Sequence, residues 1–70
     1  MTVTLERCRS HERHSVPQAW ESVKTGTPAV IADYYSDELT HTQRVTDAWR
    51  VTDDTGRTWD MVEFLRSVYA

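Results

Sequence analysis

The sequence is poor in cysteine, proline and glycine, with one, two and two of each in 70 residues, and it has no long apolar run. The single cysteine, Cys8, excludes an intramolecular disulfide and favours a reducing, cytoplasmic compartment. The longest purely apolar run covers residues 29–32, far short of the roughly 20 residues that span a bilayer. With glycine only at Gly26 and Gly56, a glycine-rich loop that cradles phosphate is not expected.

The length of the chain predicts one domain over residues 1–70, and we expect a free-standing gene product. A chain of this size buries only about 60% of the surface that its unfolded form exposes. Three tryptophans, three tyrosines and one phenylalanine supply much of the apolar material. Little of the core remains to shape a reaction pocket, so we expect neither an enzyme nor a bound cofactor.

The formal net charge of −3 is unevenly distributed. Residues 1–14 carry three arginines against two glutamates, which leaves +1, and the remaining residues therefore carry −4. The three arginines are Arg7, Arg9 and Arg13. A protein that binds nucleic acid without sequence preference gains most of its affinity from cationic contacts to phosphate, and the acidic bulk of this chain argues against that class.

The first part of the chain predicts a strand followed by a helix. Residues 2–8 alternate apolar and polar side chains, with Val3 and Leu5 facing inward. Residues 16–25 follow a Ser15 N-cap, and their apolar residues have the i, i+3, i+4, i+7 spacing of a helix that packs through Trp20.

The middle of the chain predicts a central strand and a loop. Residues 28–35 contain a short apolar run followed by two tyrosines, which favours a strand. Residues 36–44 are polar and without period, so we expect a loop there.

The last third contains the strongest local signals. Gly56 follows two aspartates in a turn, and a three-residue hairpin loop would place Val51 opposite Trp59 and Arg50 opposite Asp60. Asp60 is also a good N-cap, with Glu63 three residues later, for a helix whose apolar residues follow a helical period. Those apolar residues are Met61, Phe64, Leu65 and Val68.

Together these elements predict an α+β fold: a small three- or four-stranded, mostly antiparallel sheet with two short helices, in the order β-α-β-β-β-α. The alternative is a small SH3-like barrel formed by residues 28–35, the loop to 44 and the hairpin of residues 45–60, with the helices as appendages.

A metal site is the most specific chemical alternative. One thiolate and three imidazoles could satisfy a tetrahedral zinc ion, and the chain offers Cys8, His11, His14 and His41. The C-x2-H-x2-H spacing is not a usual zinc-finger spacing, and the other interpretation is a small buried cysteine with solvated histidines. A cysteine–histidine catalytic pair would also need an orienting group and an oxyanion hole, and no glycine-rich or helix-entry segment near Cys8 offers them.

Aromatic and acidic residues are the best candidates for binding. Seven aromatic rings are more than so small a core can easily hide, and tyrosine and tryptophan are frequent interface anchors. At least one of five rings should be exposed: Tyr34, Tyr35, Trp49, Trp59 or Tyr69. The acidic residues either meet a basic partner or form an ordinary solvated surface. The candidate partner-binding residues are Tyr34, Tyr35, Asp37, Glu38, Trp49, Asp53 and Asp54.

The sequence therefore predicts a non-catalytic protein that inhibits or regulates a larger protein or protein complex, and a homodimer is compatible with it. Small inhibitors encoded by phages and other mobile elements, anti-CRISPR proteins among them, have a similar size and charge, but no motif is shared. Two alternatives remain: a small nucleic-acid-binding regulator that uses the arginines of residues 7–13, and a zinc-stabilised binding module.

Overall fold

A four-stranded antiparallel sheet is the framework of the protein in a computed structural model that describes residues 1–9 and 19–70. The strand order is β2-β1-β3-β4. The strands are β1 (Val3–Cys8), β2 (Glu21–Gly26), β3 (Ala48–Asp53) and β4 (Thr58–Asp60). Because β2 and β4 lie at opposite edges, the sheet is open and the barrel alternative is wrong. The predicted α+β class with a small antiparallel sheet is confirmed.

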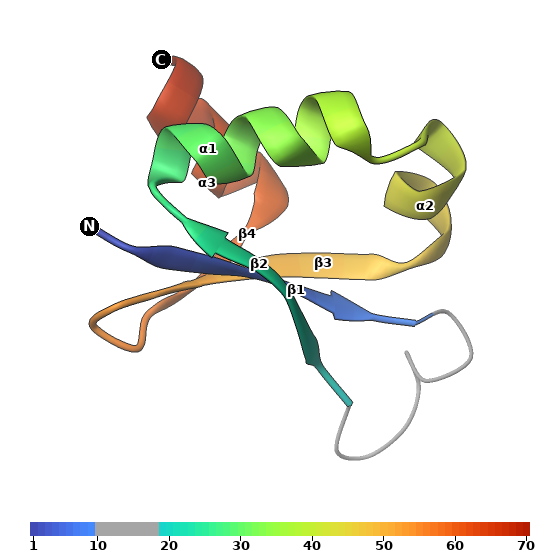
Figure 1. Cartoon of the computed structure of the whole chain (residues 1–70), viewed down its shortest axis with the longest axis horizontal. Helices are drawn as coiled ribbons and strands as arrows, with labels where there is room; N and C mark the ends of the chain where they lie inside the picture. Colours follow the sequence, from blue (N-terminus) through green and yellow to red (C-terminus); the bar gives the residue numbers. More distant parts are fainter. Residues whose placement is uncertain (10–18) are drawn as a thin grey trace.

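The helices lie together on one face of this sheet (Figure 1). They are α1 (Pro28–Asp33), the π-helical turn η2 (Tyr34–Glu38), α2 (His41–Thr46) and α3 (Met61–Tyr69). The order along the described chain is β1-β2-α1-η2-α2-β3-β4-α3, so the predicted order of elements is wrong. Within the described ranges, none of these helices has the length and apolar character needed to cross a membrane.

The predicted first strand and hairpin are confirmed. Val3 and Leu5 are buried on β1, as the alternation of apolar residues required. In the β3–β4 hairpin, Val51 pairs with Trp59 and Arg50 pairs with Asp60. Gly56 has φ of +88°, a left-handed conformation that residues with a Cβ rarely adopt. The turn chemistry alone therefore set the register correctly.

The predicted C-terminal helix is also confirmed. The Asp60 side chain accepts from the Glu63 backbone N–H at 3.0 Å. Met61 and Phe64 are the buried residues of α3. The Glu63 side chain accepts from the Arg57 guanidinium at 2.8 Å.

The predicted helix over residues 16–25 is wrong for its described part. Residues 16–18 lie outside the described residues, and residues 21–26 form β2. This strand pairs antiparallel with β1, where Thr25 faces Thr4 across 3.1 Å between their hydroxyl oxygens. An isolated helix of about ten residues is marginal in water, so pairing with β1 overrides the weak helical period.

The predicted strand over residues 28–35 is wrong because this segment begins as a capped helix. The Thr27 hydroxyl accepts from the Val30 backbone N–H at 3.3 Å, and Pro28 stands in the first turn, where its missing N–H costs no bond. Ile31 and Ala32 then point into the core. Only half of the apolar run is buried, because Ala29 and Val30 are exposed on the other side of this helix.

The predicted loop over residues 36–44 is wrong at both ends, because residues 36–38 belong to η2 and α2 begins at His41. Thr40 and Gln43 form a reciprocal capping box: the Thr40 hydroxyl accepts from the Gln43 N–H at 3.1 Å, and the Gln43 side chain accepts from the Thr40 N–H at 2.9 Å. A hydrophobic period is absent from this helix, and the cap alone was the available signal.

The core lies between the sheet and the helical layer. It consists of Val3, Leu5, Ile31, Ala32, Leu39, Trp49, Val51, Met61 and Phe64. On the opposite face of the sheet a row of threonines crosses all four strands, in the order Thr25, Thr4, Thr52, Thr58. On the same face, the carboxylate of Glu6 accepts from Arg50 at 3.0 Å and from Thr52 at 2.5 Å.

Candidate functional site

One of the candidate aromatic residues, Trp49, belongs to the core, and another, Tyr35, is half-buried against it. Tyr35 and Trp49 meet edge to face, with 5.9 Å between ring centroids and an angle of 75° between the rings. Trp49 is 9% exposed, and its Nε1 donates to the Gln43 carbonyl at 2.9 Å. Burial raises the pKa of Tyr35. Because Trp49 is buried, it packs the fold and offers little surface to a partner.

Three candidate residues meet in one groove on the helical layer. Tyr34, Asp37 and Glu38, all from η2, line an open groove of about 450 Å³. The remaining lining residues are Lys24, Val30 and Asp33. The Lys24 ammonium lies 5.2 Å from the centroid of the Tyr34 ring, which holds this cation against the aromatic face. Counted over the residues that the structure describes, three carboxylates and one ammonium give this acidic groove a formal charge of −2.

The other two acidic candidates, Asp53 and Asp54, lie at the β3–β4 turn, and Asp53 organises it. One oxygen of Asp53, Oδ1, accepts from the Thr55 backbone N–H at 2.9 Å and from the Arg57 backbone N–H at 3.0 Å. Its second oxygen accepts from the Trp59 Nε1 at 3.1 Å. Hydrogen bonds from the Thr55 and Trp59 side chains lower the pKa of Asp53 to about 2. Asp53 is therefore a turn-forming residue, as one of the two sequence interpretations held.

The outer side of α3 carries an apolar groove that the sequence reasoning missed. Val62, Leu65, Tyr69 and Ala70, together with Arg66, line an open groove of about 620 Å³. Val62 is 61% exposed and Tyr69 is 56% exposed, which confirms that at least one of the five candidate rings lies on the surface. The signal was present, because Val62, Leu65 and Tyr69 stand at i, i+3 and i+7 beside the core stripe.

A hydrogen bond links the two grooves. The Tyr69 hydroxyl, at the edge of the α3 groove, donates to Asp33 Oδ1 in the acidic groove at 2.9 Å. Asp33 ends α1 and Tyr69 ends α3, two helices that pack against each other. We call the two grooves together the α3–η2 surface. It combines an apolar part and an acidic part on adjoining helices.

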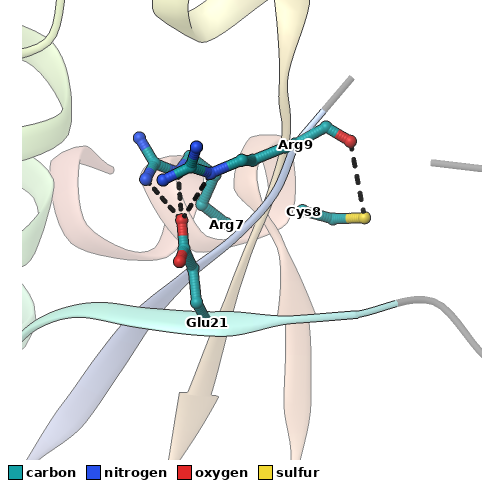
Figure 2. Close-up of polar contacts among 4 residues, drawn as sticks. All are labelled: Arg7, Cys8, Arg9 and Glu21. Carbon is teal, nitrogen blue, oxygen red and sulfur yellow. Dashed lines mark hydrogen bonds and ion pairs between the residues drawn. The ribbon is translucent and has the colours of Figure 1, made fainter. Parts of the chain in front are cut away.

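A charged cluster joins β1 to β2, and its geometry bears on nucleic-acid binding. Figure 2 shows the guanidinium groups of Arg7 and Arg9 converging on one carboxylate oxygen of Glu21. The Arg7 Nε–Oε1 distance is 2.8 Å, and the Arg9 Nε–Oε1 distance is 3.3 Å. These two partners, Arg7 first, hold the pKa of Glu21 below its usual value. One carboxylate thus offsets part of the positive charge that would attract phosphate.

The candidate zinc ligands are only partly placed. Cys8 is buried, and its thiol lies 3.9 Å from the Arg9 carbonyl oxygen (Figure 2). His41 is exposed at the first residue of α2. His11 and His14 lie outside the described residues. In the part of the chain that the structure describes, no group of three or more histidine, cysteine, aspartate or glutamate side chains is arranged to hold a metal ion.

The described residues build an exposed surface with an apolar part and an acidic part. Its apolar part can bury against a partner, and its carboxylates can pair with cations. Comparison with protein-family models, with curated proteins and with solved structures finds no match to this chain.

Proposed function

We propose that this protein is a non-catalytic inhibitor or regulator that acts by covering part of a larger protein with its α3–η2 surface. The observation that carries the proposal is the exposed apolar groove on α3, joined to the acidic groove through the Tyr69–Asp33 hydrogen bond. A partner in a reducing, cytoplasmic compartment would fit the free thiol of Cys8.

The energetic argument begins with the cost of leaving α3 exposed. Val62 and Tyr69 keep more than half of their surface in water although the protein has few apolar side chains to bury. Burial of apolar area contributes about 25 cal/mol per Å², so these two side chains would contribute more in an interface than they do in the free protein. Tyrosine in particular supplies a rigid ring and a hydroxyl, a combination common among interface anchors.

The size of the molecule fits this mode of action. A standard interface takes about 800 Å² from each partner, and the described protein exposes 4545 Å². One interface would therefore use roughly a sixth of the surface, and the helical layer can provide it without a change in the sheet.

Nucleic-acid binding is the weaker candidate. Arg7 and Arg9 point to Glu21, and Arg13 lies outside the described residues. A nucleic-acid complex would lose affinity steeply as the salt concentration rises, so a salt titration against single- and double-stranded DNA and RNA separates this function from protein binding.

The proposal is tested by comparing three baits: the natural chain, Val62→Lys and Thr58→Lys. Val62 lies in the α3 groove, whereas Thr58 is exposed on the threonine row of the opposite sheet face. Both variants gain the same charge at an exposed position, so circular dichroism should report an unchanged fold. We expect the host protein captured by the natural chain, identified by mass spectrometry, to be lost with Val62→Lys and kept with Thr58→Lys. We also expect its activity to fall when the natural chain is added.

Equal capture by all three baits would overturn the proposal, because a docking surface on α3 should not tolerate a lysine in place of one of its exposed apolar side chains. Loss of capture with Thr58→Lys alone would move the interface to the open sheet face and would also overturn it.

A further inference from the structure

We infer that the partner presents a basic amphipathic helix to the α3–η2 surface, with its apolar side in the α3 groove and its lysines or arginines against the acidic groove. This inference rests on the proposed function and names the chemistry of the partner.

The shape of the apolar part favours a helix as the occupant. Val62 and Tyr69 stand seven residues apart on α3, which corresponds to about 10 Å along a helix axis at 1.5 Å per residue. Leu65 fills the interval between them. A row of side chains along one helix is the kind of ridge that a second helix packs beside, and two turns of a partner helix match its length.

The charge of the adjoining groove favours a basic partner. Asp37 and Glu38 are exposed on η2, and Asp33 is held beside them by the Tyr69 hydroxyl. Lys24, which also lines this groove, stands over the Tyr34 ring. The groove therefore keeps its formal charge of −2, and cations on a partner would find complementary charge at the end of the apolar groove.

A second copy of the chain fits this surface less well. Arg66 lines the middle of the α3 groove. In an antiparallel pairing of α3 with its symmetry mate about the centre of the helix, each Arg66 would face the other, and like charges at close range are unfavourable.

The test uses two synthetic peptides of about 15 residues, a length at which amphipathic helices can form. Both peptides carry leucines at i, i+3, i+4 and i+7 spacing. One peptide carries lysine at all the remaining positions, and the other carries glutamate there. Binding to the whole protein is followed by fluorescence anisotropy of a labelled peptide at low salt. We expect the lysine peptide to bind at least tenfold more tightly than the glutamate peptide, and Val62→Lys to weaken the lysine peptide.

A matched pair of variants separates a local interaction from general charge attraction. Asp37→Lys and Asp54→Lys make the same change in net charge, but Asp37 lines the acidic groove and Asp54 lies in the β3–β4 turn. We expect Asp37→Lys to weaken binding of the lysine peptide at least threefold. The change in affinity caused by Asp54→Lys should be less than half of the change caused by Asp37→Lys.

Equal affinity of the two peptides, or equal effects of the two aspartate variants, would overturn the inference. A dimer in sedimentation experiments that Val62→Lys dissociates would also overturn it, because a second copy would then occupy the groove. If host-protein capture depends on Val62 while the peptides do not discriminate, the inference alone fails and the proposed function stands.

Discussion

The side chain of Arg44 should be a main support of the helical layer. Its Nη1 lies within hydrogen-bond distance of three backbone carbonyl oxygens, those of Tyr35 at 3.2 Å, Ser36 at 3.0 Å and Leu39 at 2.7 Å. The last carbonyls of a helix have no partner within the helix. Arg44, on α2, therefore closes the end of η2 and ties the two elements together.

Replacement of Arg44 by alanine removes these contacts at once. A hydrogen bond to a charged group contributes about 1.5–3 kcal/mol net. Two N–H groups on Nη1 serve three carbonyls, and water can replace the guanidinium at the exposed Ser36, so we expect a total loss of about 2–3 kcal/mol. A domain of 70 residues has a free energy of unfolding of about 4–10 kcal/mol. The change is therefore a large share of the stability.

The assay is urea denaturation followed by tryptophan fluorescence and far-ultraviolet circular dichroism. With a slope near 1 kcal/mol per molar urea, the midpoint should fall by about 2–3 M for Arg44→Ala. Arg44→Lys should recover part of this, since an ammonium keeps the charge and loses the planar fork. Arg66→Ala, an exposed arginine on α3, is the control and should stay within about 0.5 kcal/mol. Equal midpoints for Arg44→Ala and Arg66→Ala would refute the reasoning.

Three further predictions concern the turn and the caps. The pKa of Asp53 is lowered from 3.8 to about 2 by folding, so its contribution to stability is complete above about pH 4 and is lost as the pH falls toward 2; Asp53→Asn should remove that part of the acid dependence of the melting temperature. Thr40→Ala breaks the capping box with Gln43 and should cost about 1 kcal/mol in urea denaturation, whereas no change would show that α2 does not need its cap. Gly56→Ala forces a side chain into φ of +88° and should cost about 1–2 kcal/mol, with an unchanged midpoint as the contrary result.

Local sequence patterns were sufficient to predict an element where the residues that interact lie within one short segment. The hairpin register followed from the turn at Gly56, because a short loop leaves only one alignment of Val51 with Trp59. The last helix followed from the Asp60 cap and an apolar stripe. In these segments the interacting residues are close in sequence, so no information about the rest of the chain was needed.

The candidate site was recovered only in part. Tyr34, Asp37 and Glu38 line one groove as a group, but Tyr69, which donates a hydrogen bond to Asp33 of that groove, lies more than 30 residues later in the sequence. The distinction between the exposed Tyr69 and the buried Trp49 is set by which face each element turns to the core. The residue types alone do not predict which of the two rings is buried.

The sequence by itself determined the α+β class, the alternation of buried residues along β1, the hairpin and the last helix, because each leaves a pattern within one short segment: a period of two, a turn with glycine, or a cap followed by a helical period. Only the tertiary structure decided that residues 21–26 form a strand and that residues 28–33 form a helix. A short apolar run is compatible with either conformation. The choice depends on β1, which offers backbone hydrogen bonds to one segment, and on the sheet, whose apolar face the other segment covers.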